Sequence, residues 1–155
     1  MSEILSMKSL RAAVKNGSID TVVAAFPDMQ GRLMGKRFHA KFFVDNAWEE
    51  THCCNYLIAT DLEMATVDGY ESTSWSAGYG DYVMRPDLDT LCVLPWLEGT
   101  ALVLCDLLDH HTHELVPHAP RTVLKQQLKR AADLGLAMMA ATELEFFVFR
   151  ETFET

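Results

Sequence analysis

Residues 21–43 read TVVAAFPDMQGRLMGKRFHAKFF, and this stretch decides how the first part of the chain folds. Its beginning, from Thr21 to Phe26, is β-branched and apolar, which is typical of a buried strand. Residues 28–31 follow, with Asp first and Gly last, as a type I turn prefers. The segment from Arg32 to Phe43 then returns with mixed apolar and basic side chains, as a second strand. The stretch therefore predicts a β-hairpin.

Further elements are predicted on both sides of this hairpin. They are a helix over residues 3–16, a long ordered loop from Leu57 to Asp81, strands over Leu91–Leu97 and Thr100–Leu108, a polar turn and connector over 109–119, a helix from Pro120 to Gly135, and an apolar strand over Leu136–Phe149. This order predicts an α+β unit followed by the opening of a second unit.

Composition narrows the class of protein. The 155 residues include 13 Lys+Arg and 22 Asp+Glu, a net charge of −9, and 49% are hydrophobic. The apolar residues are numerous enough to form a hydrophobic core, which excludes intrinsic disorder. The net negative charge argues against binding to nucleic acids and to anionic membranes. The sequence has neither a membrane-spanning apolar run nor a signal peptide, so we expect a cytoplasmic protein. The four cysteines form no C-x-x-C pair and are expected to stay reduced.

Glu143-Leu144-Glu145 interrupts the last apolar stretch with two carboxylates. In a strand both would lie on one face, about 6–7 Å apart, with a repulsion of about 2 kcal/mol at an intermediate dielectric constant. A hard divalent cation such as Mg²⁺ or Mn²⁺ would relieve that repulsion. The alternatives are a strand with one solvated face, or a pair neutralised by basic side chains.

Two other polar segments carry side chains that could bind a ligand or a metal ion. In the loop, the carboxylates of Asp68, Glu71 and Asp81 lie among aromatic residues and could hold a cationic or amine ligand, although an ordinary ordered loop is the simpler interpretation. Gly78-Tyr79-Gly80 lacks the third glycine and the helix of a dinucleotide fingerprint. A group of histidines in the connector fits a solvated turn better than a metal site; it comprises His110, His111, His113 and His118.

Taken together, the motifs resemble the N-terminal part of the glutamine synthetase family over about residues 20–150. The matching stretches are FPDMQGRLMGKR (26–37), GYGD (78–81), RPDLDTL (85–91), LPWLEGTA (94–101), APRTVL (119–124) and TELEFFVF (142–149), in the order and spacing of the family.

The resemblance implies a fold, a reaction and site residues. The fold would be a β-grasp N-terminal domain followed by the first helix and strand of an α/β catalytic domain. The family joins glutamate to ammonia or another amine through a γ-glutamyl phosphate, using ATP and two or three divalent ions. Glu143 and Glu145 match its metal-binding E-x-E pair. Asp68 resembles an aspartate that helps to bind ammonium in the neighbouring subunit of a homo-oligomer, and Asp81 a second acidic residue near that site.

One departure bears on the amine. After Asp68-Gly69 this chain has Tyr70-Glu71, where members that use ammonia carry two serines, so the chain looks more like the branch that uses larger amines, such as glutamyl-polyamine synthetases. We expect the β-grasp domain over residues 1–110, a connector over 111–119, and the beginning of an incomplete catalytic domain over 120–155. The chain would then be the N-terminal portion of the ligase, with little activity alone. The alternative is a non-catalytic module that assembles with itself or with a full-length paralogue.

Overall fold

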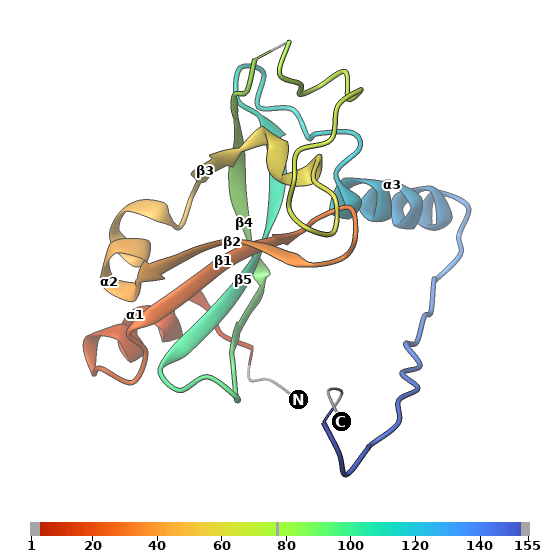
Figure 1. Cartoon of the computed structure of the whole chain (residues 1–155). Coiled ribbons are helices and arrows are strands. Elements are labelled where there is room, and N and C mark those ends of the chain that lie inside the picture. The colour runs from red at the N-terminus through yellow and green to blue at the C-terminus, as the bar shows by residue number, and fades with distance from the viewer. Residues whose placement is uncertain (1–3, 77, 153–155) are drawn as a thin grey trace.

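The computed structural model describes residues 4–76 and 78–152 of the protein. These residues form a mixed β-sheet, and helices precede, interrupt and follow its strands along the chain (Figure 1). The elements in chain order are α1 (Met7–Lys15), β1 (Thr21–Pro27), β2 (Leu33–His39), α2 (Ala40–Phe42), a π-helical turn (Phe43–Ala47), β3 (Thr51–Cys54), a 3-10 turn (Asn55–Ile58), β4 (Asp81–Val93), β5 (Thr100–Asp109) and α3 (Pro120–Asp133). No helix of the described residues is long and apolar enough to span a membrane.

The sheet has five strands in the order β2-β1-β5-β4-β3. The two strands β1 and β5 run parallel, with Thr21 opposite Thr100 and Ala25 opposite Leu104, and the other neighbours are antiparallel. β1 and β5 have hydrogen-bonded neighbours on both edges, and most of their side chains are buried. The predicted α+β class is confirmed at this level.

The predicted hairpin is present, but its second strand is shorter than expected. β1 and β2 pair from Thr21 opposite His39 to Pro27 opposite Leu33. From Ala40 the chain turns into α2 and the π-helical turn, so the extension of the strand to Phe43 is wrong. The apolar residues at 40, 43, 44 and 47 are all buried, and this is the spacing of a helix face rather than of a strand.

The first of the two later strands is also placed differently. β4 begins at Asp81, ten positions before the predicted start, and ends at Val93 before Pro95. Its register against β5 shifts between Asp87 and Cys92. Pro86 is tolerated within β4 because pairing with β3 already ends at Met84, so that at Pro86 the strand is paired with β5 alone.

The first helix begins later than predicted. Ser6 is its N-cap and forms a reciprocal capping box with Ser9, and Asn16 and Gly17 end it as expected. Residues 4–6 are not helical, and position 3 of the predicted helix lies outside the described residues. Leu10 is fully buried and attaches α1 to the core that lines the sheet.

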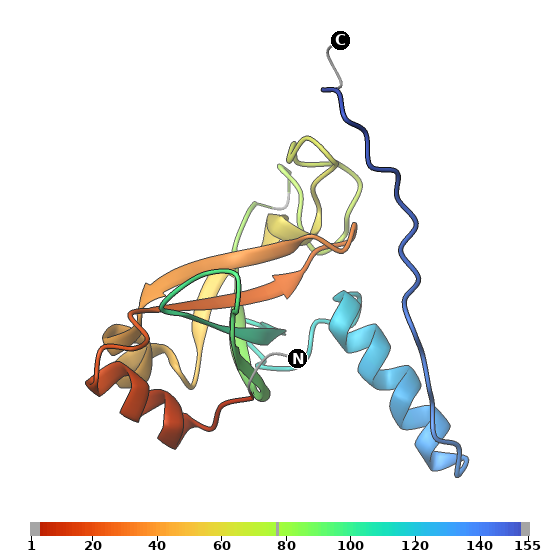
Figure 2. The same ribbon diagram turned by 90° about the horizontal axis from the view of Figure 1, so that it is seen from below.

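The predicted helix after Pro120 is confirmed, but the strand after it is not formed. α3 has proline in its first turn and is followed by Gly135 with a φ of 75°. Residues 136–149 run as an extended, exposed tail apart from the sheet (Figures 1 and 2). Since a strand requires hydrogen bonds from a neighbour, and none of the described strands lies beside this segment, the apolar sequence alone cannot make one.

Candidate functional site

Asp68 lies in the long loop that connects the 3-10 turn with β4. The described part of this loop is organised by isolated bridges, which pair Thr60 with Thr66 and Ser74 with Gly78. The backbone N of Val67 donates to the carbonyl of Ala59 at 2.9 Å. The prediction of a long, ordered loop is therefore confirmed up to β4.

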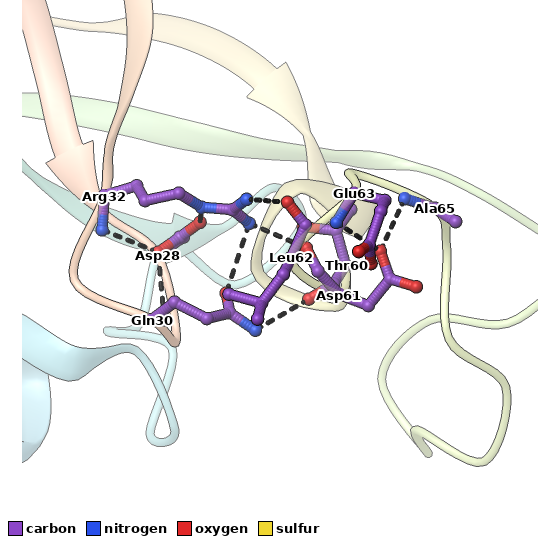
Figure 3. A network of polar contacts seen from close by, with 8 residues as sticks. All are labelled: Asp28, Gln30, Arg32, Thr60, Asp61, Leu62, Glu63 and Ala65. Carbon is purple, nitrogen blue, oxygen red and sulfur yellow. Dashed lines mark hydrogen bonds and ion pairs between the residues drawn. The ribbon is translucent and has the colours of Figure 1, made fainter. Parts of the chain in front are cut away.

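The beginning of the loop is attached to the β1–β2 turn through a network centred on Arg32 (Figure 3). The carboxylate of Asp28 is fully buried and accepts the Nε of Arg32 at 2.7 Å. The two other nitrogens of the guanidinium donate to the loop: Nη1 to the carbonyl of Leu62 at 2.7 Å, and Nη2 to the carbonyl of Asp61 at 2.8 Å. The Nε2 of Gln30 adds a bond to the carbonyl of Thr60 at 3.0 Å. We call this set the Arg32 clamp; its members are Asp28, Gln30, Arg32 and the carbonyl groups of residues 60–62.

The far end of the loop is organised by Asn55. Its buried side chain accepts the hydroxyl of Thr73 at 2.9 Å and the backbone N of Gly80 at 3.2 Å. Beside it, the ring of Tyr79 meets those of Tyr56 and Trp75 edge-on. The aromatic residues thus contribute to the order of the loop.

Asp68 itself lines a shallow hollow of about 450 Å³ with Tyr70 and Trp75. Glu71 instead lines a second hollow, of about 570 Å³, next to Asp109 and Glu114. Asp81 is the exposed first residue of β4 and lines neither hollow. The structure therefore brings Asp68 together with two aromatic residues, and it does not gather the three carboxylates of the loop at one point.

Glu143 and Glu145 lie on the exposed tail after α3. Among the described residues, no group of three or more His, Cys, Asp or Glu side chains is arranged to hold a metal ion. Carboxylate oxygens are nevertheless the donors that Mg²⁺ and Mn²⁺ prefer, so the pair fits part of such a site. The role of these two residues as metal ligands stays a prediction.

A partly buried group of charges joins α3 to the sheet and was not predicted from the sequence. Asp106 on β5 accepts the Nε of Arg121 at 3.0 Å and the Nζ of Lys125 at 2.7 Å. Asp87 on β4 also pairs with both cations. Burial opposes the ionised form of Asp87, but the hydrogen bond and charge of Lys125 and the charge of Arg121 outweigh it and lower the pKa of Asp87. A carboxylate in an otherwise apolar strand, Asp106, was the signal that could have revealed this group.

The polar turn after β5 and two of the cysteines have structural positions. The carboxylate of Asp109 accepts the backbone N–H groups of His111 and Thr112, which forms the predicted polar turn. Cys53 and Cys105 are buried, and burial raises the pKa of each thiol to about 12. At neutral pH these thiols are protonated and behave as small apolar side chains.

Known proteins are similar in sequence to this chain over almost its whole length. The γ-glutamylethanolamide synthetase of Streptomyces coelicolor is 53% identical over 151 residues, which are 97% of this chain and 32% of the relative. The model of the catalytic domain of glutamine synthetase matches residues 117–155. The chain belongs to the glutamine synthetase family.

One further sequence relative and one solved structure agree with this assignment. The glutamate–isopropylamine ligase of a Pseudomonas species is 35% identical over 92% of this chain and 31% of its own length. The solved structure of GmaS without ligand superposes with a TM-score of 0.57 at 25% identity, over 79% of this chain and 26% of GmaS. The chain thus spans about a third of the length of the curated relatives it matches.

Proposed function

We propose that this chain is the N-terminal portion of an ATP-dependent ligase that joins the γ-carboxylate of glutamate to an amine through a γ-glutamyl phosphate. The observation that carries the proposal is the 53% identity with a γ-glutamylethanolamide synthetase over 97% of the chain. A second relative is named for the joining of glutamate and isopropylamine. Both names describe an organic amine, which favours a substrate larger than ammonia.

The proposal divides the chain into three parts. Residues 1–110 form a β-grasp domain, 111–119 a connector, and 120–155 the beginning of the catalytic domain. The five-stranded sheet, whose last strand ends at Asp109, supports the first part. The match of the catalytic-domain model to residues 117–155 supports the last.

Asp68 is the proposed contact for the amine. A protonated amine carries one positive charge, which a carboxylate attracts and which aromatic rings also favour. The hollow beside Asp68 offers that combination, because Tyr70 and Trp75 line it as well. Asp81 is proposed as a second acidic residue near that site, although it lines neither hollow. In a homo-oligomer this loop would serve the catalytic domain of a neighbouring copy.

Glu143 and Glu145 are the proposed ligands for Mg²⁺ or Mn²⁺. Their carboxylates are exposed, so a cation and the remaining ligands of the full catalytic domain could reach them. A bound divalent cation would neutralise the charge of the ATP phosphates during phosphoryl transfer. In the cytoplasm, where we place the protein, ATP, glutamate and Mg²⁺ are all available.

A chimera tests this function directly. Residues 1–155 replace the matching segment of the Streptomyces relative, and phosphate release is measured with ATP, glutamate and one of three amines: ammonia, ethanolamine or isopropylamine. We expect release that requires glutamate and is faster with an organic amine than with ammonia. The variant Glu143→Gln should reduce it at least about a hundredfold, because a metal ligand is lost. An assembled chimera without amine-dependent release would contradict the proposal.

The alternative function, a non-catalytic assembly module, is favoured by one observation. Several large apolar side chains of α3 and the tail are exposed, among them Leu124, Phe146 and Phe147. Light scattering of the chain with and without the full-length Streptomyces relative tests it. Formation of a mixed assembly, combined with an inactive chimera, would favour the module over the ligase.

A further inference from the structure

The Arg32 clamp joins two segments that are far apart in sequence. Residues 61 and 62 are 29 and 30 positions from Arg32, and its two terminal nitrogens bind their carbonyl groups at 2.8 and 2.7 Å. The same guanidinium binds the carboxylate of Asp28 through Nε. Three acceptors in these directions suit the planar fork of arginine, and a lysine ammonium could not satisfy all three from one point.

The hydrogen bonds continue from the clamp to the neighbourhood of Asp68. Asp61 forms a tight turn in which its Oδ1 accepts the backbone N of Glu63 at 3.0 Å and of Ala65 at 2.9 Å. The backbone N of Asp61 in turn donates to the carbonyl of Ala65 at 2.9 Å. The next fixed group is the amide of Val67, bonded to Ala59. Asp68 follows Val67 directly, so these hydrogen bonds fix the backbone position from which Asp68 extends.

The clamp adds little net charge near Asp68. Arg32 is 30% exposed, whereas the side chain of Asp28 is fully buried against it. Burial opposes ionisation of Asp28, but hydrogen bonds from Arg32 and Gln30 outweigh it, so the pKa of Asp28 is lowered and the carboxylate remains charged. Its charge offsets that of the guanidinium. A cationic amine therefore meets Asp68 without a strong repulsion from Arg32.

We infer that Arg32 is a positioning residue, which holds the 59–67 segment against the β1–β2 turn and thereby fixes the carboxylate of Asp68 for an amine substrate. The part that concerns the amine rests on the proposed function. The part that concerns the loop stands on the contacts of the described residues alone, and the two are tested separately.

The loop is tested in the 155-residue chain with Arg32→Lys, which keeps the charge and removes the fork. Amide exchange followed by NMR should become about tenfold faster at Ala65 and Val67, while the amides of β1 and β5 keep their rates. The ¹³C signal of the Asp68 carboxyl group should shift as well. The matched control is Arg37→Lys, which makes the same change at an exposed position of β2 and should alter neither signal.

Two results would overturn the inference about the loop. One is unchanged exchange at Ala65 and Val67 in a folded Arg32→Lys protein. The other is an equal acceleration throughout the sheet, which would mean that Arg32 supports the whole fold. If Arg32→Lys does not fold, Gln30→Ala removes the bond to the carbonyl of Thr60 and the 3.3 Å bond from Arg32 Nη2 to Gln30 Oε1, but it keeps the bonds of Arg32 to residues 61 and 62. It should accelerate the same two amides by a smaller factor.

The amine is tested in the chimera described above. Arg32→Lys should raise the KM for the amine about tenfold and leave the KM for glutamate within about twofold, because only the contact through Asp68 is displaced. Equal changes in both constants, or none, would overturn the positioning role. If the unsubstituted chimera has no ligase activity, the proposed function fails, and the exchange experiment still decides whether Arg32 holds the loop.

Discussion

At the scale of single residues, Asp28 shows how one buried carboxylate organises a turn. Its Oδ1 accepts the backbone N of Gln30 at 2.9 Å and of Arg32 at 2.8 Å, and its Oδ2 accepts the Arg32 side chain. Each donor binds the ionised form, so the carboxylate is stabilised as an anion although it is buried. The turn and the Arg32 clamp therefore depend on the same charge.

This charge predicts a pH-dependent loss of stability. The folded state lowers the pKa of Asp28 below its ordinary value of 3.8, so its stabilisation is complete above that pH and is lost as pH falls through the folded pKa. Asp28→Asn should lower the free energy of unfolding by about 2 kcal/mol at neutral pH. In urea melts, the difference from the unsubstituted protein should be constant from pH 7 to 5 and shrink below about pH 4. A difference that stayed constant in acid would contradict this role.

At the scale of elements, the contact between β1 and β2 requires a glycine at position 35. A Cβ built there would lie 2.1 Å from the carbonyl oxygen of Ala24 and 2.8 Å from the Cα of Ala25. Both obstacles are backbone atoms of β1, so neither can rotate away. Gly35→Ala should therefore cost about 3 kcal/mol or more of stability, measured by thermal or urea unfolding.

Gly31 is the matched control for Gly35, because it lies in the turn of the same hairpin. Nothing lies within 4 Å of a Cβ at Gly31, although its φ is +84°. Gly31→Ala should cost only the strain of the left-handed conformation, about 1 kcal/mol. Equal losses for the two substitutions would show that the close approach of the strands is not the cause.

The attachment of α3 to the sheet depends on the ion pairs of Asp87 and Asp106 with Arg121 and Lys125. Asp106→Ala would remove the more buried of the two carboxylates that pair with Arg121, which is only 16% exposed, and would leave it with Asp87 alone. We expect a loss of about 3 kcal/mol and faster amide exchange throughout α3.

An exposed pair on the same helix is the control for this ion-pair group. Lys129 binds Asp133 at 2.8 Å, with both side chains more than half exposed. Lys129→Ala should change stability by less than about 0.5 kcal/mol. If the two substitutions loosened α3 equally, the buried ion pairs would not be what attaches it.

Local signals explain which elements the sequence could predict. The hairpin, α1 and α3 depend on turn and capping residues near them in the chain, so they were found. The second strand was predicted to continue through residues 40–43, although the buried positions at 40, 43, 44 and 47 have helical spacing. β4 begins ten positions before its predicted start, where it pairs with β3, and the local sequence does not reveal that pairing.

The candidate site was predictable only in part, for a related reason. The sequence indicated the loop of Asp68 and its aromatic residues. It could not indicate the Arg32 clamp, since its contacts join residues about 30 positions apart. The predicted strand around Glu143 and Glu145 depends on partners that the described residues do not supply. Contacts between distant segments therefore account for what the sequence missed.

At the scale of the whole molecule, two sets of apolar side chains differ sharply in burial. Those around the sheet form the buried core, with Phe26 and Phe43 almost inaccessible. Those of α3 and the tail remain exposed, among them Phe146 at 80% and Phe147 at 88%. Apolar side chains exposed in such numbers, on an extended segment without hydrogen-bonded neighbours, favour association between chains.

We therefore predict that the isolated chain self-associates through its tail. Replacing Phe146, Phe147 and Phe149 by serine should shift light scattering at a fixed concentration toward the monomer, because each substitution removes an exposed aromatic ring. The control is Trp96→Ser, which removes an aromatic ring that is 75% exposed in the turn between β4 and β5. It should leave the distribution of species unchanged.

The thermal transition should be the same in both variants, since the tail contributes nothing to the core. An unsubstituted chain that remains monomeric at high concentration would show that these exposed rings do not drive association.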